Sequence, residues 1–141
     1  MKVSFDIGGV ISKYPDQFRT LINCLQHSNN IEVFIITDMH DRQQSISMLE
    51  MNKIQIKQEN LYSADFSTYG EACKAVLLKE LEIDIHFDDF PAYIAEGCPV
   101  RLLVLPDINR PYYDDEWKTP TNIGDFGRRK RCEAYRNSVL K

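Results

Sequence analysis

The stretch EVFIITD, residues 32–38, decides the fold class of this chain. Its nearly unbroken apolar run predicts a strand that is buried on both faces, as in a parallel sheet covered by helices. Residues 1–7 predict another strand, because Val3, Phe5 and Ile7 alternate with polar residues before two glycines. Such strands alternate along the chain with helical patterns, which favours an α/β fold.

The rest of the chain continues this alternation. The helical spacing of Phe18, Leu21 and Ile22 predicts a helix that begins at Pro15, since proline is accepted in a first helical turn. The predicted strands span residues 1–7, 32–36, 60–63, 83–87 and 100–105, and the predicted helices span residues 15–26, 41–52, 71–81 and 90–96. We therefore expect a Rossmann-like three-layer sandwich with a mainly parallel five-stranded sheet.

Length and spacing limit the domain organisation. A chain of 141 residues can bury one hydrophobic core but not comfortably two, so we expect a single domain over residues 1–141. Its core would span about residues 2–105, and residues 106–141 would form an extension rich in Pro, Tyr, Asp and Arg. Only 31 positions separate Asp6 from Thr37, and 37 separate Thr37 from Lys74, which leaves no room for a large cap domain.

Composition excludes several classes of function. The 17 Lys and Arg residues and 21 Asp and Glu residues give a net charge of −4, which does not favour a coat on nucleic acid or a membrane-surface binder. No apolar run approaches the roughly 20 residues that cross a bilayer, and Asp6 would interrupt a secretion signal. The four cysteines are at least 25 positions apart, so neither a zinc site nor a CxxC redox motif is supported. We expect a cytoplasmic protein with no membrane partner.

Polar residues follow three of the predicted strands. In an open parallel sheet, ligands bind at the carboxyl ends of the strands, where these residues would meet. Alone, each could be a turn residue, a helix cap or part of a solvated helix face. Together they offer the oxygen ligands that Mg²⁺ prefers and an ammonium for a phosphate, which favours phosphoryl transfer. The set comprises Asp6 after the first strand, Thr37 and Asp38 after the second, Asp88 and Asp89 after the fourth, and Lys74 on the helix before the last pair.

Four stretches in this order resemble the motifs of the haloacid dehalogenase-like (HAD) superfamily. VSFDIGGVIS at 3–12 is similar to its first motif, a strand ending in a nucleophilic Asp, and VFIITD at 33–38 is similar to its second. CKAVLLKELEIDIHFDDFP at 73–91 is similar to the third and fourth, a helix-borne Lys followed by a strand and an acidic pair. The resemblance covers about residues 2–105 and is to minimal, capless members of the phosphatase type.

The resemblance implies a role for each matching residue. Asp6 would attack phosphorus and, with Asp89 and the backbone carbonyl of Gly8, would bind Mg²⁺. Asp88 would orient the site or bind the metal through water, so the choice between Asp88 and Asp89 as the direct ligand stays open. The phosphoryl group of the substrate would be held by Thr37, Asp38 and Lys74, with Lys79 as the weaker alternative to Lys74.

One position departs from the pattern. The family's phosphatases usually carry an Asp two positions after the nucleophile as general acid and base, and this chain has Gly8. Its loss favours substrates with good leaving groups, unless His40, Asp41 or Tyr14 replaces the missing acid. The expected function is a Mg²⁺-dependent phosphatase that acts through an aspartyl-phosphate on a small phosphorylated metabolite or nucleotide. The alternative is a non-catalytic or weakly active protein that binds phosphate and metal.

Other readings involve partners and switches. An open site suggests that a second copy of the chain closes it in a homo-oligomer. The basic run at 128–131 leaves open a phosphatase that processes nucleic-acid ends, although the acidic net charge does not favour nucleic acid. A phospho-receiver is discounted, because receivers carry the acidic pair after the first strand and the phosphorylated Asp after the third. We interpret His86, in the middle of a strand, as a packed and hydrogen-bonded residue.

Overall fold

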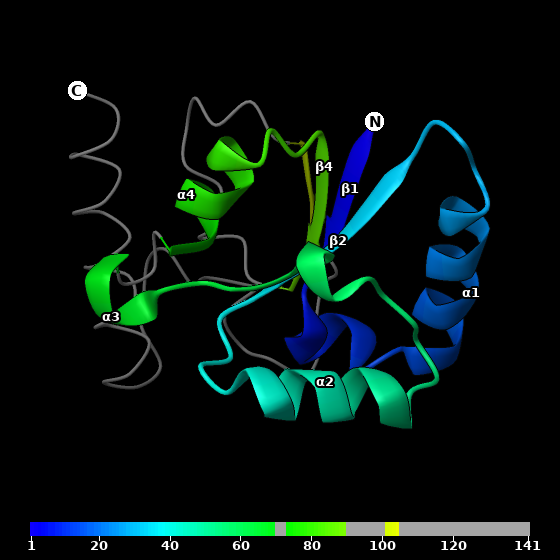
Figure 1. Ribbon diagram of the computed structural model, residues 1–141, viewed down its shortest axis with the longest axis horizontal. Coiled ribbons are helices and arrows are strands. Elements are labelled where there is room, and N and C mark those ends of the chain that lie inside the picture. Colours follow the sequence, from blue (N-terminus) through cyan, green and yellow to red (C-terminus); the bar gives the residue numbers. More distant parts are fainter. Residues whose placement is uncertain (70–72, 90–100, 105–141) are drawn as a thin grey trace, which may run out of the picture.

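The computed structural model describes residues 1–69, 73–89 and 101–104 of the chain (Figure 1). The strands are β1 (Lys2–Phe5), β2 (Glu32–Thr37), β3 (Leu61–Ser63), β4 (Ile85–Asp88) and β5 (Arg101–Val104). The helices are α1 (Pro15–Gln26), α2 (Arg42–Met51), α3 (Phe66–Tyr69) and α4 (Cys73–Glu80). The predicted helix at 90–96, the extension at 106–141 and the basic run at 128–131 lie outside the described residues.

The strands form one sheet in the order β3-β2-β1-β4-β5, and each neighbouring pair is parallel. The chain therefore starts in the middle of the sheet, moves outward through β2 and β3, and crosses back to β4. The parallel α/β fold predicted from the sequence is confirmed. Between β1 and β3, the connections hold α1, α2 and short turns only, and no cap domain is inserted there.

Helices cover both faces of the sheet (Figure 1). Alternate side chains of β1 and β2, such as Phe5 and Ile35, are buried with Phe18 of α1 and Leu49 of α2. The opposite face is smaller, and Phe34 and Ile36 of β2 pack there with Leu78 of α4 and with Ile83. β2 has buried side chains on both faces, which confirms the prediction made from its apolar run.

Local signals set the ends of the two longer helices. α1 spans the residues predicted for it, with Pro15 in its first turn. α2 begins one residue later than predicted, because Asp41 is its N-cap and accepts hydrogen bonds from the backbone N–H groups of Gln43 and Gln44. It also ends one residue earlier, at Met51, with Asn52 as its C-cap. Within the described part of the chain, no helix has the length and apolar character needed to span a bilayer.

Two predicted strand boundaries were wrong, one because of a local turn and one because of a contact between distant residues. The first strand ends at Phe5 rather than residue 7, because residues 7–11 form a wide turn closed by a hydrogen bond from Ser12 N–H to Ile7 C=O. The fourth strand begins at Ile85 rather than residue 83, because the Asp84 carboxylate accepts a hydrogen bond from the backbone N–H of Lys2. The short helix α3 was not predicted.

Candidate active site

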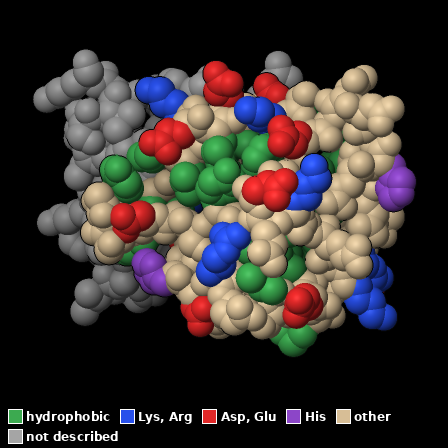
Figure 2. Space-filling model, in the orientation of Figure 1, with side chains coloured by type: hydrophobic (Ala, Val, Ile, Leu, Met, Phe, Trp, Pro, Cys, Tyr) green, Lys and Arg blue, Asp and Glu red, His purple; other side chains and the backbone are tan. Residues whose placement is uncertain are grey.

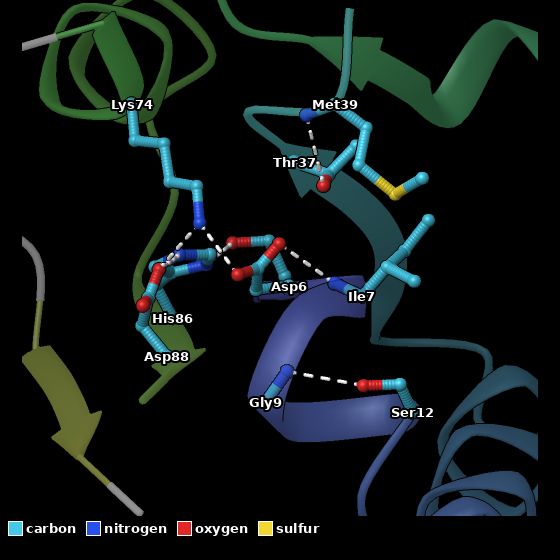
Figure 3. Close-up of polar contacts among 10 residues, drawn as sticks. Asp6, Ile7, Gly9, Ser12, Thr37, Met39, Lys74, His86 and Asp88 are labelled. Atoms are coloured by element: carbon cyan, nitrogen blue, oxygen red, sulfur yellow. Dashed lines mark hydrogen bonds and ion pairs between the residues drawn. The ribbon is translucent and has the colours of Figure 1, made fainter. Parts of the chain in front are cut away.

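The predicted site residues lie where β1, β2 and β4 reach the carboxyl edge of the sheet (Figure 3). Asp6 follows β1 directly, Thr37 is the last residue of β2 and Asp88 is the last residue of β4. Since β1 is hydrogen-bonded to both β2 and β4, these three strand ends are neighbours. This is the position at which open parallel sheets bind ligands.

Asp6 is held by its backbone and by one carboxylate oxygen. Its N–H donates to the carbonyl of Phe87 at 2.9 Å, which continues the pairing of β1 with β4. Its Oδ1 accepts a hydrogen bond of 2.7 Å from the backbone N–H of Ile7 and so caps the turn that follows. The second oxygen, Oδ2, contacts the amine of Lys74 at 2.7 Å. The side chain is therefore buried with both oxygens in polar contact.

Lys74 joins two carboxylates. It is the second residue of α4, and its Nζ lies 2.7 Å from Asp6 Oδ2 and 2.9 Å from Asp88 Oδ2. The lysine is fully buried, so these ion pairs form away from solvent. Lys79, the weaker alternative from the sequence, is exposed on the same helix. The helix-borne cation of the site is therefore Lys74.

A second set of contacts supports Asp88 from inside the sheet. Asp88 Oδ2 also lies 2.9 Å from His86 Nε2, and His86 Nδ1 lies 2.8 Å from the hydroxyl of Ser4. Ser4 and His86 are register partners in the parallel pair of β1 and β4. The interpretation of His86 as a buried, hydrogen-bonded residue is confirmed, and its polar partners connect it to the site.

Asp89 completes an acidic group. Asp6, Asp88 and Asp89 are all buried, and each offers one carboxylate oxygen that lies within 4.8 Å of those of the others. The turn after β1 approaches Asp89 closely, because a Cβ atom built on Gly9 would stand 2.2 Å from Asp89 Cγ. Gly9 also has φ = 67°, so both the backbone conformation and the lack of space for a Cβ atom require glycine in this turn.

Burial and pairing shift the pKa values of these groups in different directions. Burial raises the pKa of Asp6 from 3.8 to about 7, although Lys74 opposes the shift. Burial also acts against ionised Asp88, but Lys74 and His86 outweigh it and hold the pKa of Asp88 at about 2. Burial lowers the pKa of His86, so its imidazole is neutral at pH 7.

Lys74 stays charged for the same reason. Burial alone would lower the pKa of Lys74, but the charges of Asp6 and Asp88 outweigh it and the net shift is upward. Among the residues that the structure describes, three buried carboxyl groups thus lie together with the buried ammonium of Lys74. Buried charges require compensation, and hard divalent cations prefer carboxylate oxygens. The donor set therefore fits a Mg²⁺ ion.

Thr37 and Asp38 lie at the adjacent strand end. Thr37 is fully buried, and its Oγ1 accepts a hydrogen bond of 3.4 Å from the backbone N–H of Met39. Asp38 is half-buried, and its charge raises the pKa of both Asp6 and Lys74. Figure 3 places Thr37 across from Asp6, on the side of the cluster away from Asp88.

Gly8 has an ordinary backbone conformation, with φ = −66° and ψ = 131°. A Cβ atom at this position would meet only Asp6 Oδ2, at 3.7 Å, which is normal van der Waals contact. A side chain at position 8 would therefore stand beside Asp6 without steric conflict. Two of the groups suggested to replace a missing acid are engaged elsewhere, since Asp41 caps α2 and His40 packs edge-on against Phe66.

The sequence missed three members of this arrangement. Ser4 and Gly9 were not singled out, and His86 was not connected with the acidic pair. A signal was present for two of them, because Ser4 and His86 are polar residues that each stand between two apolar residues of a strand. Gly9 could be recognised only as one of two consecutive glycines.

The visible surface adds no second charged site. On the face drawn in Figure 2, acidic and basic side chains of the described residues are interspersed. No continuous basic surface for a polyanion is seen on that described face. The basic cluster that would test the nucleic-acid reading, at 128–131, lies outside the residues described.

Comparisons with known proteins do not identify the chain. No protein-family model, no curated protein and no solved structure matches it significantly. The HAD-like resemblance therefore depends on the motifs in the sequence.

Proposed function

We propose that this chain is a Mg²⁺-dependent phosphohydrolase of the HAD-like type that acts through an aspartyl-phosphate intermediate. The observation that carries the proposal is the contact of Lys74 Nζ with Asp6 Oδ2 at 2.7 Å, inside a buried cluster that also holds Asp88 and Asp89. A nucleophilic carboxylate, an ammonium for the phosphate and two further carboxylates for a metal are the groups that this reaction needs. The same proposal includes the fold expected from the sequence, a Rossmann-like three-layer sandwich of the HAD-like superfamily.

The metal would be held by Asp6, Asp89 and the backbone carbonyl of Gly8. Asp88 already shares one oxygen between Lys74 and His86, which favours a role in orienting the site. Bound Mg²⁺ supplies positive charge that offsets the carboxylates and the phosphate and favours the ionised form of Asp6. The fit depends on the three buried carboxylates, each of which offers an oxygen within 4.8 Å of those of the others.

The chain's own residues perform the chemical steps. A carboxylate oxygen of Asp6 forms a bond to phosphorus, and the bond from phosphorus to the leaving oxygen breaks, so that this oxygen departs with the electron pair. Water then cleaves the aspartyl-phosphate, which restores the Asp6 carboxylate and releases inorganic phosphate. Lys74 and Thr37 would hold phosphoryl oxygens during both steps, with Asp38 beside them.

The absence of a side chain at Gly8 supports a second candidate, a weakly active or non-catalytic protein that binds phosphate and metal. No acid at position 8 can protonate a leaving alkoxide, and general acid–base catalysis typically contributes 10²–10⁴-fold. The proposed substrate is a small phosphorylated metabolite or nucleotide, and a second copy of the chain is the proposed partner that closes the site. Under the first candidate, substrates with stable leaving groups are hydrolysed fastest.

The test is phosphate release from acetyl phosphate and 4-nitrophenyl phosphate, with Mg²⁺ and with EDTA. The first candidate predicts Mg²⁺-dependent turnover that Asp6→Asn abolishes and Asp16→Asn, an exposed change on α1, leaves intact. It also predicts a hydroxylamine-labile phosphoryl label on the wild type that is absent from Asp6→Asn. Binding of Mg²⁺ and inorganic phosphate without turnover would favour the second candidate, and binding of neither would refute both.

A further inference from the structure

A continuous series of buried polar contacts leads from the interior of the sheet to the proposed nucleophile (Figure 3). Every residue in it is nearly or fully buried. The contacts are Ser4 Oγ to His86 Nδ1 at 2.8 Å, His86 Nε2 to Asp88 Oδ2 at 2.9 Å, Asp88 Oδ2 to Lys74 Nζ at 2.9 Å, and Lys74 Nζ to Asp6 Oδ2 at 2.7 Å. The mechanism above uses the last three residues and leaves Ser4 and His86 without a role.

The positions of Ser4 and His86 are unusual for their surroundings. Each occupies the middle of a strand whose neighbouring positions pack into the apolar core, as Phe5 and Phe87 do in stacked contact. Burying a hydroxyl or an imidazole is unfavourable unless each finds a hydrogen-bond partner. Here the two side chains are partners, and the second nitrogen of His86 is directed to Asp88 rather than to the backbone.

The chemistry of the groups sets the direction of each hydrogen bond. An ionised carboxylate only accepts, so His86 Nε2 must carry the hydrogen that it donates to Asp88. In the neutral imidazole, Nδ1 is then the acceptor, and the Ser4 hydroxyl donates to it. Asp88 Oδ2 therefore receives one hydrogen bond from its own strand and one from Lys74 on α4.

We propose that His86 is a positioning residue, which together with Ser4 holds the Asp88 carboxylate so that Asp88 keeps Lys74 against Asp6. This inference deepens the proposed function and rests on it for its kinetic consequences. Lys74 has several rotatable bonds, and its amine is placed by the two carboxylates that it contacts. If Asp88 rotates, the amine loses its contact with Asp88 and is held less firmly beside Asp6.

Two substitutions separate positioning from packing. His86→Gln keeps an N–H donor near the place of Nε2 but loses the ring, whereas His86→Phe keeps the ring and loses the donor. Positioning predicts that His86→Phe lowers kcat for acetyl phosphate by about 10- to 100-fold with little change in KM, and that His86→Gln recovers most of this loss. A packing role predicts the reverse order of the two variants, and that result would overturn the inference.

Ser4→Ala gives an independent test, because it removes a single hydroxyl. It is expected to lower kcat in the wild-type background and to have no further effect in His86→Gln, where the Nδ1 acceptor is gone. An equal effect in both backgrounds would contradict the proposal that Ser4 acts on Asp88 through His86. His27→Gln, an exposed change at the end of α1, is the matched control and should leave kcat unchanged.

A readout without turnover keeps the two proposals distinguishable. Acetic anhydride labelling, followed by mass spectrometry, reports how accessible the Lys74 amine is relative to exposed Lys79. Lys74 should be protected in the wild type and in His86→Gln, and labelled several-fold faster in His86→Phe. If the wild type hydrolyses no phosphate but this contrast is present, the proposed function fails and the positioning role of His86 stands. If labelling is the same in all three proteins, the positioning role fails even where turnover is observed.

Discussion

The Asp89 carboxylate lies against the α-carbon of Gly9, in the space that any other residue at position 9 would need. A Cβ atom there would stand 2.2 Å from Cγ and 2.3 Å from Oδ2 of Asp89. The contact brings the turn after β1 against the residue that follows β4, although 80 positions of the chain separate them. Glycine at this place lets the first and the last carboxylates of the acidic group meet.

Gly9→Ala should therefore lower stability and displace Asp89. The left-handed backbone alone costs about 1–2 kcal/mol for a residue with a Cβ atom, and the overlap with Asp89 adds to it. Gly8→Ala is the matched control, because its backbone is ordinary and its Cβ would lie 3.7 Å from Asp6 Oδ2, so its stability should change by less than about 1 kcal/mol. Urea unfolding measures the free energy of unfolding of both variants. Equal losses would contradict the close contact between Gly9 and Asp89.

Lys74→Met should be strongly destabilising in the absence of metal. It removes the ammonium that pairs with the buried carboxylates of Asp6 and Asp88, and breaking a buried ion pair by removing one partner costs about 3–5 kcal/mol. Lys79→Met, on the exposed side of the same helix, should stay within about 0.5 kcal/mol of the wild type. Denaturant unfolding in EDTA measures both. A loss below about 1 kcal/mol for Lys74→Met would argue against the buried pair.

Local patterns predicted the parts of this molecule that depend on short-range physics. The bounds of α1 follow from Pro15 and from apolar spacing, and the run in β2 requires cover on both faces. The sequence also predicted that Asp6, Thr37 and the pair of Asp88 and Asp89 lie close together, because the ends of parallel strands meet at one edge of the sheet. Contact of Lys74 with two of these carboxylates was consistent with its place in the chain but was not specified by it.

The remaining features depend on contacts between distant residues. β4 begins at Ile85 because the Asp84 side chain, rather than a ladder hydrogen bond, meets the N–H of Lys2. In the register of β1 with β4, Ser4 faces His86, and a shift of one residue would turn His86 to the opposite face of the sheet. No local pattern gives this register, so the series of polar contacts from Ser4 through His86 to Asp88 could not be predicted from the sequence.

Mg²⁺ should stabilise the folded protein if the acidic group binds it. A ligand at 100 times its Kd adds about 2.7 kcal/mol, which corresponds to a rise in Tm of about 5–10 °C for a domain of this size. Asp89→Asn should remove most of this rise, whereas the exposed Asp16→Asn should retain it. Thermal unfolding in MgCl₂ and in KCl of equal ionic strength tests the expectation. An undiminished rise in Asp89→Asn would place the cation elsewhere.

Asp65 provides a pH-dependent prediction away from the metal site. Hydrogen bonds from the Ser67 hydroxyl at 2.6 Å and from Thr68 N–H at 3.1 Å lower the pKa of Asp65 from 3.8 to about 2. Because the folded pKa is the lower one, its stabilising effect is fully present above pH 3.8 and is lost as the pH falls through 2. Ser67→Ala should raise the pKa toward 3.8 in an NMR titration of the Asp65 carboxyl carbon. An unchanged pKa would mean that the Ser67 hydroxyl does not hold the carboxylate.

Gly8→Asp should add the acid that the site lacks. The backbone at position 8 accepts any residue, and a Cβ there would lie 3.7 Å from Asp6 Oδ2, so the new carboxyl would stand beside the reacting group. Hydrolysis of an alkyl phosphate, whose leaving oxygen needs a proton, should accelerate by about 10²–10⁴-fold. Acetyl phosphate should gain little, because acetate leaves without protonation.

Gly8→Asn is the matched control, since it has a similar shape but cannot transfer a proton at neutral pH. If Gly8→Asp and Gly8→Asn behave alike on the alkyl phosphate, the missing acid does not limit the rate, and the reaction is limited by the positioning of Asp6, Lys74 and the metal.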